Sequence, residues 1–133
     1  MKYIQIKLKP GKEESLRRFH PWVFSGAIHR MTAQPEDGAV VEVLDKHGQF
    51  IALGHYQIAS IMVRVLTFER EETDLEFFKK RLRAAYDVRQ SVGLIDKEYN
   101  NTYRLVHGEG DYLPGLIIDI YDKTAVMQAH SPG

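Results

Sequence analysis

Short segments with alternating apolar residues fill the first seventy residues, and their spacing constrains the fold more than any other feature. In YIQIKL, Ile4, Ile6 and Leu8 alternate with polar residues, which is the pattern of a strand with one buried face. Three similar segments follow, AVVEVLD, QFIALGHY and IMVRVLTF, and the turn DKHG joins the first two of them as a hairpin. Strands this short and this closely spaced predict a small β-barrel.

Two segments depart from the strand pattern. In RRFHPWVFSGAI, Pro21 removes a backbone donor and Gly26 permits a sharp turn, so we expect a short helical turn or corner. A helix is expected over residues 73–92, with Thr73 as its N-cap and Glu76 completing a capping box. Its apolar residues recur at helical spacing, namely Leu75, Phe78, Leu82, Ala85 and Tyr86.

The residues most typical of RNA binding lie in and just before RRFHPWVFSG. Lys12, Arg17 and Arg18 are cations that could neutralise phosphates, and His20 and Trp22 are rings that could stack on unpaired bases. We therefore predict an RNA-binding surface from these five residues. The alternative is that Trp22 fills the barrel core and the arginines only face solvent.

The segment YRLVHGEGDYLPG places His107, Glu109 and Asp111 among glycines. A strand rather than a helix is expected after it, which argues against a phosphate-binding loop. Glu109 and Asp111 could form an acid/base pair, but we favour a glycine-rich turn whose carboxylates are solvated or cap the backbone.

The last two apolar segments, GLIIDIY and TAVMQAH, read as a hairpin with one apolar face that needs a cover. The chain therefore reads as one that ends inside a domain. We expect residues 103–130 either to pack on the helix at 73–92 or to associate between two chains as a weak homodimer.

Composition excludes several classes of site. The chain has 133 residues, no cysteine and a formal net charge of zero. Disulfides, thiolate metal sites and thiol nucleophiles are thereby excluded, and the spacing of the six histidines indicates no metal site. No apolar run approaches the length of a membrane span, and the N-terminus lacks an apolar signal core, so a cytoplasmic location without a membrane partner is expected.

Three stretches, RRFHPWVFSGAI, GHYQIASIMVRVLTF and YRLVHGEGDYLPGLIIDIY, together resemble the N-terminal part of the ribosomal large subunit RNA methyltransferase I family. These are S-adenosylmethionine-dependent enzymes that form 5-methylcytosine. The resemblance implies a mainly β fold with α. It comprises a PUA-like RNA-binding barrel at 1–70, a connector helix at 71–98, and the opening strands of an incomplete α+β middle domain at 99–133.

The same resemblance implies that ribosomal RNA is the partner and that S-adenosylmethionine binds in a catalytic domain outside this stretch. The family's catalytic residue is a cysteine, so no catalytic residue is expected here. His107, Glu109 and Asp111 would then belong to an interdomain or substrate-channel loop, in which Tyr112 stands where the family more often has glycine. The alternative function is a stand-alone RNA- or protein-binding barrel without enzymatic activity.

Overall fold

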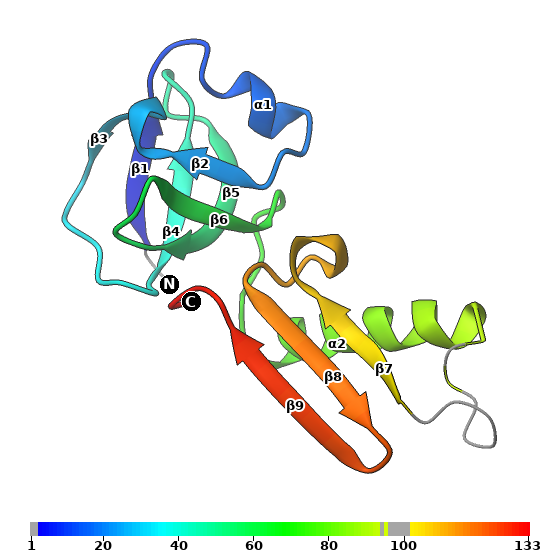
Figure 1. Ribbon diagram of the computed structural model, residues 1–133. Helices are drawn as coiled ribbons and strands as arrows, with labels where there is room; N and C mark the ends of the chain where they lie inside the picture. Colours follow the sequence, from blue (N-terminus) through cyan, green and yellow to red (C-terminus); the bar gives the residue numbers. More distant parts are fainter. Residues whose placement is uncertain (1–2, 94, 96–101) are drawn as a thin grey trace. The chain divides into compact units, whose positions relative to one another are not determined.

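The computed structural model describes residues 3–93, 95 and 102–133. They form two compact units (Figure 1). The first runs to residue 71 and includes residues 131–133, and the second covers 72–130. In the described part of the chain, no helix is long and apolar enough to cross a membrane.

The first unit is a curled sheet that forms a half-barrel, as the predicted barrel requires. Its strands are β1 (Ile4–Leu8), β2 (Trp22–Phe24), β3 (Ile28–Met31), β4 (Val40–Leu44), β5 (Phe50–Tyr56) and β6 (Ile61–Thr67), in the order β2-β6-β5-β4-β1-β3. Only β1 and β4 pair in parallel among these strands. The short helix α1 (Glu14–Arg17) and the 3₁₀ turn η1 (Ser25–Ala27) complete the unit.

The alternation predicted for the first strand is confirmed, because Ile6 and Leu8 are fully buried while Lys7 between them is not. The core inside the curled sheet draws one residue from α1, Leu16, and the rest from the strands. Its buried members are Ile6, Leu8, Leu16, Val23, Val41, Val43, Ile51, Ala52, Tyr56, Val63 and Val65.

The prediction that RRFHPWVFSGAI contains no strand is wrong. β2 and β3 both begin within it, and the expected corner is confined to η1 between them. β2 tolerates the preceding Pro21 because it is an edge strand, where a missing backbone donor costs little. The carbonyl of Pro21 still accepts a hydrogen bond of 2.7 Å from the backbone of Val65.

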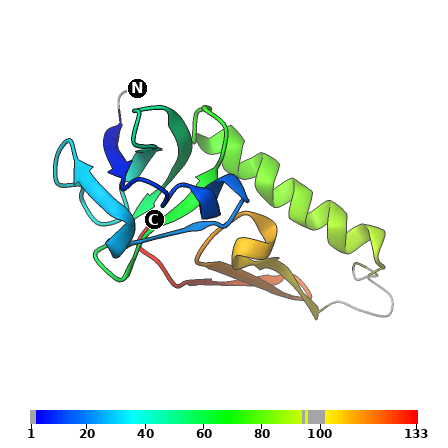
Figure 2. The same ribbon diagram turned by 90° about the horizontal axis from the view of Figure 1, so that it is seen from above.

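The second unit packs the helix α2 (Leu75–Ser91) against a three-stranded antiparallel sheet (Figure 2). The sheet has the order β7-β8-β9, with β7 at Thr102–His107, β8 at Leu116–Tyr121 and β9 at Thr124–Ala129. The turn η2 (Gly108–Asp111) joins β7 to β8. Ala85 of α2 is buried with Val106 and Ile118 of the sheet. Packing of residues 103–130 on the helix, one of the two expectations, is therefore confirmed for β7 and β8.

The helix begins one residue later than predicted. Asp74, not Thr73, is the N-cap, and its carboxylate accepts a hydrogen bond of 3.0 Å from the backbone N–H of Phe77. Asp74 is extended, as an N-cap should be, and Asp is among the best N-cap residues. The shift also corrects the buried face, since Phe77 is buried and the expected Leu75 is 68% exposed.

The domain limits at 70 and 98 stay predictions. Residues 94 and 96–101, where the expected connector gives way to the middle domain, lie outside the described residues. All six residues of β9, the last strand of the hairpin, are exposed. The homodimer that was predicted to form through this hairpin also stays a prediction.

Candidate nucleic-acid interface

The end of α1 holds an aromatic side chain in solvent. The backbone N–H of Phe19 donates to the Leu16 carbonyl at 2.9 Å, and that of His20 donates to the Ser15 carbonyl at 3.0 Å. These two bonds form a Schellman motif, whose penultimate position is left-handed and usually glycine. Here Phe19 occupies it with φ of 64° and is 72% exposed. The chain thus presents a ring where glycine would be less strained.

The three side chains of β2 alternate between the core and the outer face of the sheet. Val23 enters the core and is only 2% exposed. Its neighbours Trp22 and Phe24 belong to the opposite side of the strand, as the two-residue period requires, and Phe24 is 47% exposed. Their rings meet edge to face with centroids 6.3 Å apart. Trp22 was expected either in the barrel core or at an RNA-binding surface. Val23 takes the core position of this strand, and Trp22 is half-buried on the other side.

Two further groups contact the Trp22 ring. His20 lies edge-on to it with centroids 5.9 Å apart. The guanidinium carbon of Arg64, which is opposite Trp22 in the β2–β6 register, lies 5.6 Å from its centroid. A cation at this distance is attracted to the ring face. The ring is thus held in place, which lowers the entropy cost of stacking on a base.

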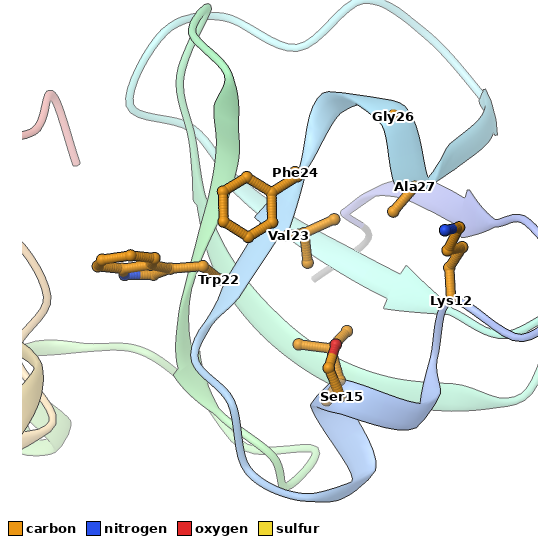
Figure 3. Close-up of a pocket in the computed structure, with 8 residues that line it drawn as sticks. Lys12, Ser15, Trp22, Val23, Phe24, Gly26 and Ala27 are labelled. Atoms are coloured by element: carbon orange, nitrogen blue, oxygen red, sulfur yellow. The ribbon is translucent and has the colours of Figure 1, made fainter.

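A cavity of about 280 Å³ lies between α1 and β2 (Figure 3). Lys12 stands at one end of this surface and Trp22 at the other, with Ser15 and Val23 between them. The cavity is slightly smaller than the pockets of about 300–1,000 Å³ that hold small ligands, so its size suits one planar group. Its lining residues are Lys12, Ser15, Leu16, Trp22, Val23, Phe24, Gly26 and Ala27.

Arg17 does not share this arrangement. Its guanidinium bonds the Asp45 carboxylate at 2.9 Å, which joins α1 to the turn after β4. The same carboxylate accepts backbone hydrogen bonds from Gln49 at 2.9 Å and from His47 at 2.8 Å. These bonds, that of Gln49 first, and the charge of Arg17 hold the pKa of Asp45 below its ordinary value. Arg17 is exposed like Lys12 and Arg18, but its guanidinium is committed to a fold contact.

The predicted loop in the second unit is held by an ion pair. Both carboxylate oxygens of Asp111 bond the guanidinium of Arg89 in α2, and one of them accepts the backbone N–H of His107 at 2.6 Å. The two side chains are only 13% and 8% exposed. Asp111 therefore orders the turn, as the favoured interpretation expected, and is not available to pair with Glu109 as acid and base. Sequence reasoning missed Arg89 because nothing in a helix pattern marks it as a buried partner.

Tyr112 follows that turn in the left-handed conformation, with φ of 58°. This conformation explains why glycine suits the position. The Tyr112 carbonyl accepts a hydrogen bond of 2.6 Å from Arg81, whose guanidinium also lies 5.5 Å from the tyrosine ring centroid. These contacts help to hold the strained residue in place.

The described residues do not fit S-adenosylmethionine. Dinucleotide-type cofactor sites place a glycine-rich turn between a strand and a helix N-terminus. The connection from β6 to α2 has no glycine and four acidic residues, and that from β1 to α1 has only Gly11. Nor does the described part of the chain contain three or more His, Asp or Glu side chains placed to hold a metal ion.

Known proteins resemble this chain both in the barrel and over its whole length. Residues 6–68 match the family model described as a PUA-like domain. The chain is 44% identical over 132 residues to ribosomal RNA large subunit methyltransferase I of Shewanella amazonensis, and 41% identical over 132 residues to that of Escherichia coli. These matches cover 98% of this chain and 33% of each relative. The chain thus spans about a third of the length of these relatives.

Solved structures share the fold. A candidate SAM-dependent methyltransferase from Streptococcus mutans superposes with a TM-score of 0.79 and 17% identity, over 96% of this chain and 33% of that one. A second structure, of a candidate methyltransferase complexed with SAH, has the same score over 32% of its chain. Residues 6–68 therefore match a PUA-like domain, and the chain as a whole matches the N-terminal third of ribosomal RNA large subunit methyltransferase I proteins.

Proposed function

We propose that this chain is the RNA-docking N-terminal part of an S-adenosylmethionine-dependent ribosomal RNA (cytosine-5) methyltransferase. The names of its relatives and its match to their N-terminal third support the class of enzyme. We further propose a role for each part of the chain. The barrel at 1–70 binds RNA, and residues 99–133 open the middle domain, whose loop at His107, Glu109 and Asp111 faces a neighbouring domain or the substrate channel.

One observation carries the docking role: a cation and two outward aromatic rings line the same cavity on the PUA-like unit. The Lys12 ammonium would neutralise a backbone phosphate. Unpaired bases would stack on the rings of Trp22 and Phe24, one base on each ring because the two rings are nearly perpendicular, as bases stack in single-stranded RNA complexes. Exposed Arg18 and His20 extend the same surface at the end of α1.

Chemistry at the cytosine ring is assigned to other parts of the enzyme. Cytosine C5 becomes nucleophilic once a thiolate adds to C6, and this chain has no cysteine. S-adenosylmethionine would supply the methyl group. Because the residues described here do not fit that cofactor, no catalytic step is assigned to them. Their contribution is to bind and orient the RNA.

The test is RNA affinity measured by fluorescence anisotropy on a labelled single strand. The double variant Lys12→Gln, Phe24→Ala should bind about 5- to 100-fold more weakly, since a stacked base contributes about 1–3 kcal/mol. Lys123→Gln, Tyr121→Ala is the matched control, because it removes an exposed cation and a ring that is 50% exposed from the second unit.

Equal losses in the two double variants would contradict this docking site. An unchanged affinity in the first variant would contradict it as well. Removal of residues 1–70 from the longer enzyme should abolish methylation of ribosomal RNA while leaving cofactor binding intact. Undiminished methylation would contradict the docking role of residues 1–70.

A further inference from the structure

A second cavity opens on the other edge of the curled sheet. It has a volume of about 240 Å³ and lies where β1, β3 and the turn after β4 meet. Its lining residues are Gln5, Lys7, Arg30, Thr32, Leu44 and Gly48. None of them lines the cavity between α1 and β2. The two cavities are therefore separate sites on the same unit.

Strand register brings two cations together here. Lys7 of β1 lies directly opposite Arg30 of β3 in the antiparallel pairing, so both side chains project from the same face. Like charges in such a pair repel each other. Among the described residues, no carboxylate forms an ion pair with either cation. A bound anion would relieve the repulsion.

Two carboxylates, on β4 and in the turn after it, are already paired with arginines. Glu42, opposite Gln5 in the β1–β4 pairing, bonds Arg70 at 3.1 Å. Asp45, next to the floor residue Leu44, bonds Arg17 at 2.9 Å. Lys7 and Arg30 are the charged residues in the cavity lining, which includes no acidic residue among those that the structure describes.

Polar donors complete the lining. The Thr32 hydroxyl oxygen accepts the backbone N–H of Gln5 at 3.0 Å, which leaves its own hydrogen to donate. The Gln5 side-chain amide supplies two further donors. Beneath them, Leu44 is 7% exposed and forms an apolar floor. Cations, a hydroxyl and an amide around one cavity match a phosphate group, whose non-bridging oxygens are strong acceptors.

We propose that this cavity binds a phosphodiester group of the RNA strand, as a second docking point beside the α1–β2 cavity. This inference rests on the proposed RNA-docking function. A single phosphate held by two partly exposed cations binds weakly, because water and salt screen such contacts. A strand already held at Lys12 supplies further phosphates at high effective concentration, which favours RNA over a small anion.

The experiment compares three double variants of the full chain in one anisotropy assay across a range of salt. Lys7→Gln, Arg30→Gln should flatten the slope of log affinity against log salt by about 0.7, the value for one neutralised phosphate on a single strand. Lys80→Gln, Lys123→Gln removes the same charge from exposed positions of the second unit and should leave the slope unchanged. The third variant is Lys12→Gln, Phe24→Ala.

The proposal is overturned if the slope is unaffected by Lys7→Gln, Arg30→Gln, or if the Lys80→Gln, Lys123→Gln control flattens it equally. Weaker binding by the Lys12→Gln, Phe24→Ala variant alone would retain the docking function and reject the second site. No RNA binding by the wild-type chain would reject both.

Lysine acylation read by mass spectrometry separates the two phosphate sources. RNA should protect Lys7, and inorganic phosphate at the same phosphate concentration should not. Protection by inorganic phosphate alone would make the cavity a small-anion site and overturn the RNA proposal.

Discussion

The guanidinium of Arg17 lies 2.9 Å from the buried carboxylate of Asp45, so one of the two neighbouring arginines at the end of α1 is tied to the fold. Arg18, the next residue, is exposed and makes no ion pair among the described residues. The two arginines are neighbours in the sequence, but the charge of Arg17 is paired with a carboxylate and, within the described part of the chain, that of Arg18 is not.

This difference predicts different results for two alanine substitutions. Arg18→Ala should flatten the salt slope of RNA affinity by about 0.7, the value for one phosphate contact on a single strand. Arg17→Ala should leave the slope nearly unchanged and lower the thermal unfolding midpoint, because it leaves Asp45 without its cation. Anisotropy and thermal melts of both variants check this, and a slope change for Arg17→Ala alone would contradict it.

Asp45 predicts how acid acts on the first unit. Its folded-state pKa lies below the ordinary 3.8, with the backbone hydrogen bond from Gln49 as the first cause. The stability that this carboxylate contributes is therefore fully present above pH 3.8 and is lost as the pH falls through the lower folded-state pKa. Asp45→Asn should be less stable than wild type at neutral pH, and the difference should shrink in acid. Urea unfolding at a series of pH values measures it, and a constant difference would contradict the assignment.

Removal of the buried carboxylate at Asp111 should destabilise the second unit. Asp111→Ala leaves the buried Arg89 guanidinium without a counter-ion, with only the Arg104 carbonyl still bonded to it at 3.0 Å, and leaves the His107 N–H without its acceptor. The loss should cost about 3 kcal/mol. Hydrogen exchange of amides in residues 102–130 measures the local loss. Asp87→Ala is the control, since its pair with Arg83 is exposed and contributes less than about 1 kcal/mol. Equal exchange in both variants would show that the Arg89 pair does not hold the turn.

The left-handed backbone at Tyr112 predicts an order of stability between two variants. Glycine adopts this conformation without the penalty that a Cβ atom carries, which is about 1 kcal/mol. Both Tyr112→Gly and Tyr112→Ala lose the ring contact with Arg81, so that loss cancels between them. Tyr112→Gly should therefore be the more stable by about 1 kcal/mol in urea unfolding followed by circular dichroism. An alanine variant of equal or greater stability would rule out backbone strain at this position.

Local patterns in the sequence predicted most of the strands, because the period of two is visible wherever one face is buried. They failed at β2 and β3, where Pro21 and Gly26 hid two short strands that exist only by pairing with β6 and β1. Here tertiary pairing overrides local propensity. Reading WVF as a strand would have placed Trp22 and Phe24 on one side and Val23 in the core.

The candidate sites could be predicted only in part. Lys12 and Trp22 were predicted to bind RNA, and both line the α1–β2 cavity, while RNA binding there stays a prediction. The partners of Arg17 and Asp111 lie 28 and 22 residues away in the chain, so only the fold identifies them. The Lys7–Arg30 pair depends on strand register, which no single segment of sequence reveals.

The most direct test of RNA docking at the α1–β2 cavity uses Trp22, the only tryptophan in the chain. Its fluorescence should be quenched as single-stranded RNA is added, in parallel with the rise in anisotropy of a labelled strand, because a base stacks on the indole ring. Lys12→Gln should shift both curves to higher RNA concentration together. RNA binding seen by anisotropy with no change in Trp22 fluorescence would contradict docking at this cavity.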